Sequence, residues 1–322
     1  MKNTVIILIL LCGSIIGQPL NKSITATQKT IGGANEIGEY NFVEYSVKSS
    51  VGKELYEIVD KVDYDIPYSK LEVFSDGSSV LISSFYGTLT FISNDGTKTK
   101  SVQIKDNIKV KYERSIKSVA DENILVVLLS EQNESNSTIQ RYNSSGNIIN
   151  SFSVNITEVN GIAYSKSINQ LYLSHIKWNN SGELDRRVTL LNSNGNVVKR
   201  FNTNFEKGFF TEDNKFVGVW NKSVFSVNTD KLELNYEIAA EDNNIFIDVT
   251  TNNNSLIVAQ AKNPELNNGE WYYKNPTIIK LDSAGKIIDK IKIDTELFSE
   301  FKFKNRNDNL EFVVGEKSII VE

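Results

Sequence analysis

The stretch IIKLDSAGKII, residues 278–288, holds an apolar run, a polar turn that ends in glycine, and a second apolar run. A glycine that tolerates a positive φ, flanked by β-branched residues, is typical of a β-hairpin. The same arrangement surrounds the turns at 94–96, 144–146 and 193–195, and the turn at 228–230 is a variant without the glycine. Five hairpins of one kind indicate an internal repeat.

A second hairpin lies upstream of each such turn, and its second strand marks the period of the repeat. These strands begin near Val80, Leu125, Leu171, Phe216, Leu256 and Leu310. The differences between these positions are 45, 46, 45, 40 and 54 residues, and each unit holds four short strands. A period of about 40 to 50 residues with four antiparallel strands is the signature of a β-propeller blade. The sequence therefore predicts an all-β propeller, most simply with six four-stranded blades.

The last unit predicts how the propeller closes. It has strands near 301–304, 310–314 and 318–321, and its outer strand is missing. The strand at 54–59 stands before the first unit, and we expect it to pair with 318–321, which would cover two open sheet edges. The strand at 42–47 has no place in this scheme, so a seventh, partial blade is the alternative.

The repeat length and the hairpin turns resemble those of the six-bladed β-propeller superfamily, which includes NHL-like, PQQ-like and lactonase-like members. The resemblance covers residues 40–322 and identifies no specific family. The Trp-Asp endings of WD40 repeats and the Gly-Trp pattern of quinoprotein propellers are not found in the sequence. The second absence counts against a quinone cofactor, and no resident cofactor is expected.

Composition narrows the chemistry further. The 322 residues include 40% apolar side chains and carry a net charge of −5, which describes a folded protein and argues against a nucleic-acid partner. The single cysteine, Cys12, and the single methionine both fall in the first 17 residues. With His175 as the only histidine, multi-histidine metal sites are excluded.

The N-terminus is predicted to be an export signal. Lys2 precedes an apolar run that is too short to span a bilayer, and small residues follow the run. We expect residues 1–17 to be a signal peptide cleaved after Gly17, with a secreted or periplasmic protein as the product. Lipidation at Cys12, which would anchor the protein in the cell envelope, is the alternative. The polar residues 18–39 are predicted to be a linker.

Polar residues stand where the innermost strands are expected to begin, at the mouth of the central channel. Lactonase-like propellers hold a divalent cation at this mouth, and by resemblance Asn160, Asn244, Asp248 and Glu300 are candidate ligands for Ca²⁺ or Mg²⁺. Lys70, Arg114 and Lys207 are expected in the same ring, where they would repel a cation or bind an anionic ligand.

His175 and Tyr172 are the catalytic candidates. Some propeller polysaccharide lyases use a histidine and a tyrosine as acid and base. Strand alternation places His175 with Leu171 and Leu173 on one face and Tyr172 on the other, which weakens the pairing.

Two insertions supply aromatic side chains. The longer, 262–276, contains Trp271, Tyr272 and Tyr273, and the shorter, 177–185, contains Trp178. Such residues stack on sugars, dock a protein, or fold onto their own blade. We therefore expect an exported binding or scaffold protein with a protein or carbohydrate ligand. The alternative is an exported enzyme, either a metal-dependent hydrolase at the channel mouth or a lyase that uses His175 and Tyr172.

Overall fold

The structure of the protein is a computed structural model. The residues that it describes are 24–35, 38–49, 53–62, 69–83, 87–104, 116–130, 136–156, 158–178, 184–241, 243–252, 255–262, 264–267, 270–295, 297–299, 301–306, 309–315 and 317–321. They divide into two compact units, Asn21–Gly208 and Phe209–Glu322, which are described separately below. The predicted signal peptide at 1–17 and Cys12 lie outside the described residues.

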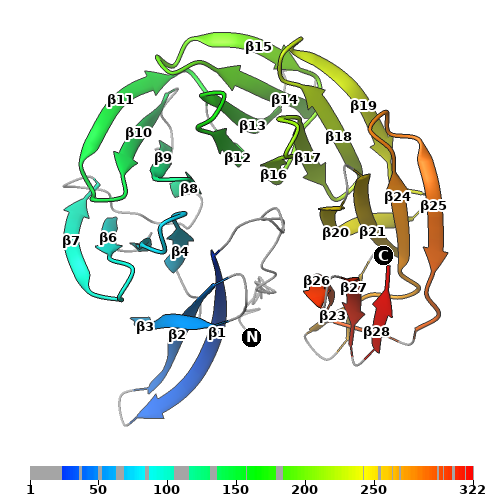
Figure 1. The fold of residues 1–322 in the computed structure, drawn as a ribbon, viewed down its shortest axis with the longest axis horizontal. Helices are drawn as coiled ribbons and strands as arrows, with labels where there is room; N and C mark the ends of the chain where they lie inside the picture. Colours follow the sequence, from blue (N-terminus) through cyan, green and yellow to red (C-terminus); the bar gives the residue numbers. More distant parts are fainter. Residues whose placement is uncertain are drawn as a thin grey trace, which may run out of the picture. The chain divides into compact units, whose positions relative to one another are not determined.

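The described part of the N-terminal unit consists of four antiparallel sheets, I to IV (Figure 1). Sheet I contains β1 (Ile24–Asn35), β2 (Gly38–Ser49) and β3 (Glu54–Val62). Sheet II contains β4 (Ser69–Val73), β5 (Ser79–Ser83), β6 (Thr88–Ile92) and β7 (Lys98–Gln103). Sheet III contains β8 (Ile116–Asp121), β9 (Ile124–Ser130), β10 (Ser137–Asn143) and β11 (Ile148–Val154). Sheet IV contains β12 (Val159–Ser165), β13 (Gln170–Trp178), β14 (Leu184–Leu191) and β15 (Val197–Phe201).

The described part of the C-terminal unit holds sheets V to VII and a short ribbon. Sheet V begins at the unit boundary and contains β16 (Lys207–Phe210), β17 (Phe216–Trp220), β18 (Ser223–Asn228) and β19 (Glu233–Ala239). Sheet VI contains β20 (Asn244–Asn252), β21 (Ser255–Lys262), β24 (Thr277–Leu281) and β25 (Ile287–Lys292). The ribbon pairs β22 (Glu265–Asn267) with β23 (Glu270–Tyr272), and sheet VII contains β26 (Phe301–Arg306), β27 (Asn309–Val314) and β28 (Lys317–Ile320).

Sheets II to VI confirm the predicted four-stranded unit, and in each of them the strands are hydrogen-bonded in chain order. Burial falls from the second strand to the fourth: β9 is buried over five consecutive residues, β10 alternates, and β11 is mostly exposed. Continuous apolar runs such as 125–129 are typical of strands covered on both faces. Within each unit the core lies between consecutive sheets; for example, Val126 and Leu128 of sheet III pack with Leu171 and Leu173 of sheet IV.

The repeated turn glycines are the points where one sheet contacts the sheet before it. Gly96, Gly146, Gly195 and Gly285 all have a positive φ, between 78° and 86°. A Cβ on Gly195 would lie 2.2 Å from the Phe152 ring of sheet III, and one on Gly285 would lie 2.4 Å from the Tyr236 ring of sheet V. Glycine is therefore required there both by the turn conformation and by the close approach of an aromatic ring.

Two expectations about the N-terminal part of the chain are wrong. The described part of the predicted linker is a strand, β1, which pairs with β2 over its whole length. The strand at 54–59 is part of β3, and its partner is β2 rather than the strand at 318–321. A short connection from β2 to β3 costs much less loop-closure entropy than pairing with the far end of the chain. The strand at 42–47 thus lies in β2, in a seventh sheet, which was the alternative considered.

No helix that is long and apolar enough to cross a membrane occurs in the part of the chain that the structure describes.

Candidate functional site

The innermost strands begin where the sequence predicts, which places the channel-mouth candidates on known strands. Lys70 follows the first residue of β4, Lys207 begins β16, and Asn244 begins β20. In a propeller the first strand of each blade faces the central channel. Arg114 and Glu300 lie outside the described residues.

Lys70 forms part of a charged cluster between sheets II and III. Its ammonium group lies 2.5 Å from the carboxylate of Glu72, whose side chain is only 6% exposed, whereas the Lys70 side chain is 59% exposed. Ser118 of β8 donates its hydroxyl to the same carboxylate at 2.9 Å, and its carbonyl accepts from Lys70 Nζ at 3.1 Å. Glu72, which sequence reasoning missed, therefore holds the Lys70 ammonium in place and neutralises it. Its only sequence signal is its position two residues after Lys70, on the same strand face.

Asn160 lies at a bulge in β12. The register shifts between Val159 and Gly161, so Asn160 is the extra residue of the bulge. Its Nδ2 donates to the Phe205 carbonyl at 3.1 Å, and its buried Oδ1 has no hydrogen-bond partner among the described residues. Gly161 allows this approach, because a Cβ there would lie 2.4 Å from the same carbonyl oxygen. Asn160 thus fastens the segment before sheet V to the start of sheet IV.

Asp248 is committed to a backbone contact between sheets VI and VII. Its Oδ2 accepts the N–H of Phe303 at 2.9 Å, and its Oδ1 accepts the N–H of Val249 at 2.9 Å. The residue is 8% exposed. A carboxylate with both oxygens occupied by backbone donors is well satisfied without a metal. Asn244 belongs to the same unit, and its backbone carbonyl accepts from Lys222 Nζ at 2.8 Å.

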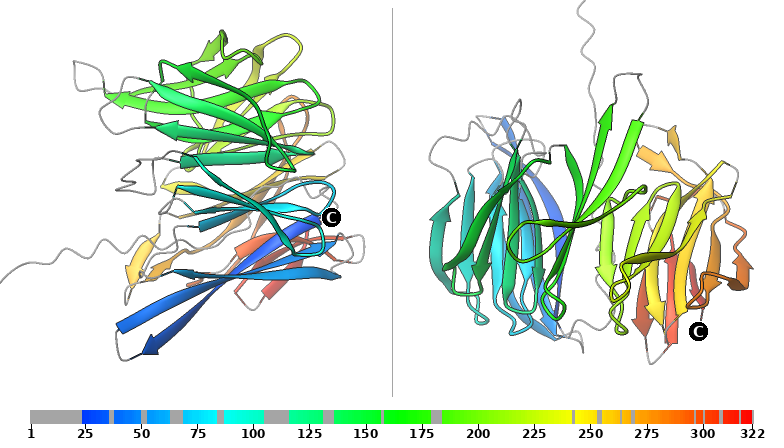
Figure 2. Two further views of the ribbon diagram at one scale, coloured as in Figure 1. Left: turned by 90° about the vertical axis from the view of Figure 1, so that its left-hand side faces the viewer. Right: turned by 90° about the horizontal axis from the view of Figure 1, so that it is seen from above.

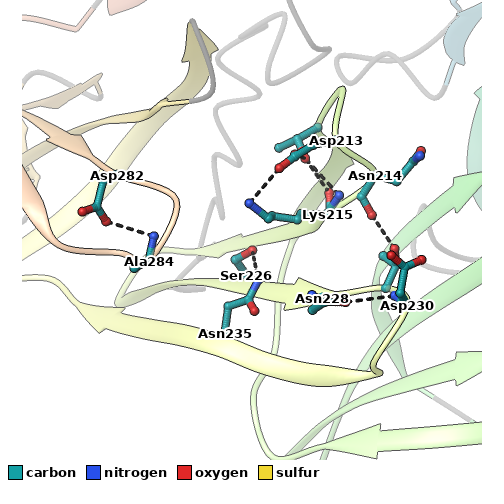
Figure 3. A network of polar contacts seen from close by, with 11 residues as sticks. Asp213, Asn214, Lys215, Ser226, Asn228, Asp230, Asn235, Asp282 and Ala284 are labelled. Carbon is teal, nitrogen blue, oxygen red and sulfur yellow. Dashed lines mark hydrogen bonds and ion pairs between the residues drawn. The ribbon is translucent and has the colours of Figure 1, made fainter.

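No group of three or more His, Cys, Asp or Glu side chains that could hold a metal ion is present among the described residues. The turns of the C-terminal unit show how its carboxylates are used (Figure 3). Asp213 forms an ion pair with Lys215 at 2.7 Å, and Asp282 accepts the turn N–H groups of Ala284 and Lys286 at 2.9 Å. These carboxylates stabilise their own turns.

His175 and Tyr172 are not brought together. Tyr172 is fully buried and donates its hydroxyl to Gln170 at 2.9 Å, and burial raises its pKa strongly. His175 is half-buried, and its Nε2 lies 3.1 Å from the Thr189 hydroxyl of β14. Burial lowers the pKa of His175, and Arg187, its cross-strand neighbour, lowers it further. A tyrosine with a raised pKa on the opposite face of the strand is poorly placed to exchange a proton through His175.

The aromatic insertion between β21 and β24 is an organised ribbon. Strands β22 and β23 pair Leu266 with Trp271, and Figure 2 shows the ribbon, in yellow-orange, extending beyond the end of sheet VI. Lys274 Nζ lies 2.9 Å from Glu265 Oε2 at its base. The side chain of Trp271 lies outside the described residues, as does that of Trp178 at the end of β13.

Tyr273 anchors the ribbon to sheet VII. Its N–H donates to the Phe298 carbonyl at 2.8 Å, and the Phe298 N–H donates back at 3.1 Å. The ring of Tyr273 stacks on Phe298 with centroids 5.8 Å apart and meets the Phe301 ring edge-on at 5.2 Å. Tyr273, predicted as a ligand-binding candidate, thus packs against the core, whereas Tyr272 is half-buried on the ribbon itself.

A buried arginine between sheets III and IV was also missed by sequence reasoning. Arg141 is 5% exposed, and its guanidinium lies 5.1 Å from the Tyr164 ring centroid and 5.6 Å from that of Phe152. Its Nη1 donates to Asn169 at 3.2 Å. Burial lowers its pKa. Alternating polar residues in β10 gave no sign that this one faces inward rather than outward.

Comparison with known proteins identifies the fold. No protein-family model matches the chain, and no curated protein matches it. Among solved structures, it is similar to the C-terminal WD40 domain of Sif2, with a TM-score of 0.55, 10% identity, and coverage of 91% of this chain and 80% of that one. It is also similar to a chain in the mitotic checkpoint complex, with a TM-score of 0.52, 11% identity, and coverage of 92% and 82%. BamB from Moraxella catarrhalis matches with a TM-score of 0.48 and 11% identity over 89% of this chain and 82% of that one. At such identities the first two likenesses show the fold alone: this chain is a β-propeller.

Proposed function

We propose that the protein is an exported binding or scaffold protein whose ligand, a protein or a carbohydrate, contacts the β22–β23 ribbon. The observation that supports this is the construction of the ribbon, which is closed by its own strand pairing and an ion pair. Tyr273 holds its base on sheet VII. A rigid scaffold that carries an anchored aromatic loop is a common way to build a binding surface.

The protein-binding form of the proposal agrees with the fold, because one of the similar solved structures is of a complex. The carbohydrate-binding form rests on Trp271 and Tyr272, since aromatic rings stack on sugar faces. Export rests on the N-terminal sequence alone.

Ribbon variants test the proposal. Wild-type protein is applied to a glycan array and, in parallel, immobilised to capture proteins from the culture medium and envelope of its own source cells. We expect one of these to give a saturable ligand whose binding Trp271→Ala reduces at least tenfold with the melting temperature unchanged. Tyr273→Phe, which keeps the rings on Phe298 and Phe301, is the matched control and is expected to bind normally. Binding that survives Trp271→Ala and Tyr272→Ala together would remove the ribbon as the site.

A further inference from the structure

The last strand of each sheet is an open edge, and most of these edges carry charges. In Figure 1, β7, β11, β15, β19 and β25 each form one edge of their sheet. The described last strands other than β11 contain at least one charged residue each: Glu54 in β3, Lys98 in β7, Lys199 in β15, Glu233 in β19, Asp289 in β25 and Lys317 in β28. Such charges prevent edge strands from pairing with another chain.

Strand β11 lacks such charges. Its sequence is IINSFSV, and among the described strands it is hydrogen-bonded only to β10, with a bulge at Ile149. Ile148 and Ile149 are 56% and 52% exposed at its start. β-branched residues on an uncharged, unpaired edge favour the addition of a further strand.

We propose that β11 is a self-association edge, at which two copies of the protein pair their β11 strands antiparallel about a two-fold axis. We assign a second copy as the occupant because two β11 strands can pair without bringing like charges together. The register centred on Ser151 places Asn150 opposite Phe152 and Ile148 opposite Val154, with the bulged Ile149 of each copy beside Ser153 of the other. The same operation on β7 would gather two lysines from each copy, Lys98 and Lys100, along one seam, and like charges on neighbouring strands are destabilising.

The geometry of β11 suits this arrangement. The inward residues Phe152 and Val154 belong to the core between sheets III and IV, which fixes the strand. Asn150 Nδ2 donates to the Ser193 carbonyl of the next sheet at 3.2 Å, and this bond also holds β11 in place. Ile149, Ser151 and Ser153 are exposed. A single pair of strands about 23 Å long is a small interface, so we expect a reversible dimer rather than an obligate one.

A cysteine cross-link tests the proposed register directly. In a Cys12→Ser background, Ser151→Cys places two thiols opposite each other on the axis, at a Cα separation of about 4.5 to 5.5 Å that a disulfide can bridge. The matched control is Ser101→Cys, because Ser101 lies two residues after the bulged Thr99 of β7, as Ser151 lies two residues after the bulged Ile149 of β11. We expect at least ten times more disulfide-linked dimer from Ser151→Cys than from Ser101→Cys under mild oxidation. Equal cross-linking of the two variants would overturn the proposal.

A charge substitution tests the same edge without cysteine. Ile149→Lys introduces two ammonium groups into the proposed seam, whereas Val198→Lys puts a lysine at the corresponding exposed position of β15. By sedimentation velocity over a wide range of concentrations, wild type and Val198→Lys should show the same monomer–dimer equilibrium, and Ile149→Lys should dimerise at least tenfold more weakly. Circular dichroism confirms the fold of each variant. A wild type that stays monomeric up to millimolar concentration refutes the proposal.

Discussion

The contact between consecutive sheets at the turn glycines can be tested by Gly195→Ala. Two costs add at this position. The φ of 82° lies in the left-handed region, where an L-residue loses about 1–2 kcal/mol. In addition, the new Cβ would lie 2.2 Å from Cδ2 of Phe152, so that the ring must move, and overpacking of this kind costs about 1–3 kcal/mol. We therefore expect Gly195→Ala to lower the free energy of unfolding by about 2–5 kcal/mol.

Gly315→Ala is the matched control. Gly315 has a φ of 54°, and a Cβ there would meet no atom within 4 Å, so only the backbone cost of about 1–2 kcal/mol applies. The gain from a less flexible unfolded chain is the same for both variants and cancels. Urea unfolding followed by circular dichroism measures the two free energies. Equal losses for both variants would refute the idea that the turn glycines form inter-sheet contacts.

A double-mutant cycle locates the effect. If Phe152 is the group that clashes, Gly195→Ala should cost about 1–3 kcal/mol less in a Phe152→Ala background than in the wild type. The cost of losing the ring itself appears in the single variant Phe152→Ala and drops out of the difference. A coupling energy near zero would mean that the strain at Gly195 is purely local.

Three further predictions concern single side chains. Burial and nearby arginines lower the pKa of His175, so the unfolded state binds a proton at this residue first as the pH falls. The free energy of unfolding should therefore decrease below about pH 6.5, by at most about 1.4 kcal/mol per pH unit. His175→Gln should remove this slope between about pH 5.5 and 7.5, and an unchanged slope would contradict the assignment. Asp248→Asn replaces one acceptor oxygen with an N–H donor beside the N–H of Phe303 or Val249. It should lower the free energy of unfolding, measured by heat or urea, by about 1–3 kcal/mol. An unchanged free energy would mean that the contact contributes little. Mass spectrometry of the protein recovered from its source cells should show Gln18 as the first residue, and an acylated Cys12 would instead establish the lipid anchor.

The strands of the repeat could be predicted from the sequence because their signals are local. The marker strands expected near Val80, Leu125 and Leu256 begin at Ser79, Ile124 and Ser255, one residue earlier. Continuous apolar runs and glycine turns depend only on neighbouring residues, so they are visible in one sequence.

Pairing between segments that are distant in the chain could not be predicted from the sequence in this way. The polar, glycine-containing sequence of β1 is typical of a linker, and it is a strand because β2 supplies twelve partner residues. Likewise, the sequence does not reveal that Asp248 accepts the Phe303 N–H, or that Glu72 accepts the Ser118 hydroxyl. These are contacts between successive sheets, and single-sequence patterns carry no information about them.

The aromatic insertion illustrates a partly correct prediction. The sequence located it between the second and third strands of a unit, where β22 and β23 lie. Sequence analysis gave Trp271, Tyr272 and Tyr273 the same role in ligand binding, whereas the ring of Tyr273 is packed against Phe298. Because consecutive residues of an extended segment face opposite sides, Tyr272 and Tyr273 cannot both pack on Phe298.

A crystal structure of the mature chain tests the central claim most directly. The β-propeller fold predicts that β4, β8 and β12 line one channel and that each turn glycine contacts the preceding sheet. Sheets stacked as two layers of a sandwich, with these first strands separated from one another, would contradict it.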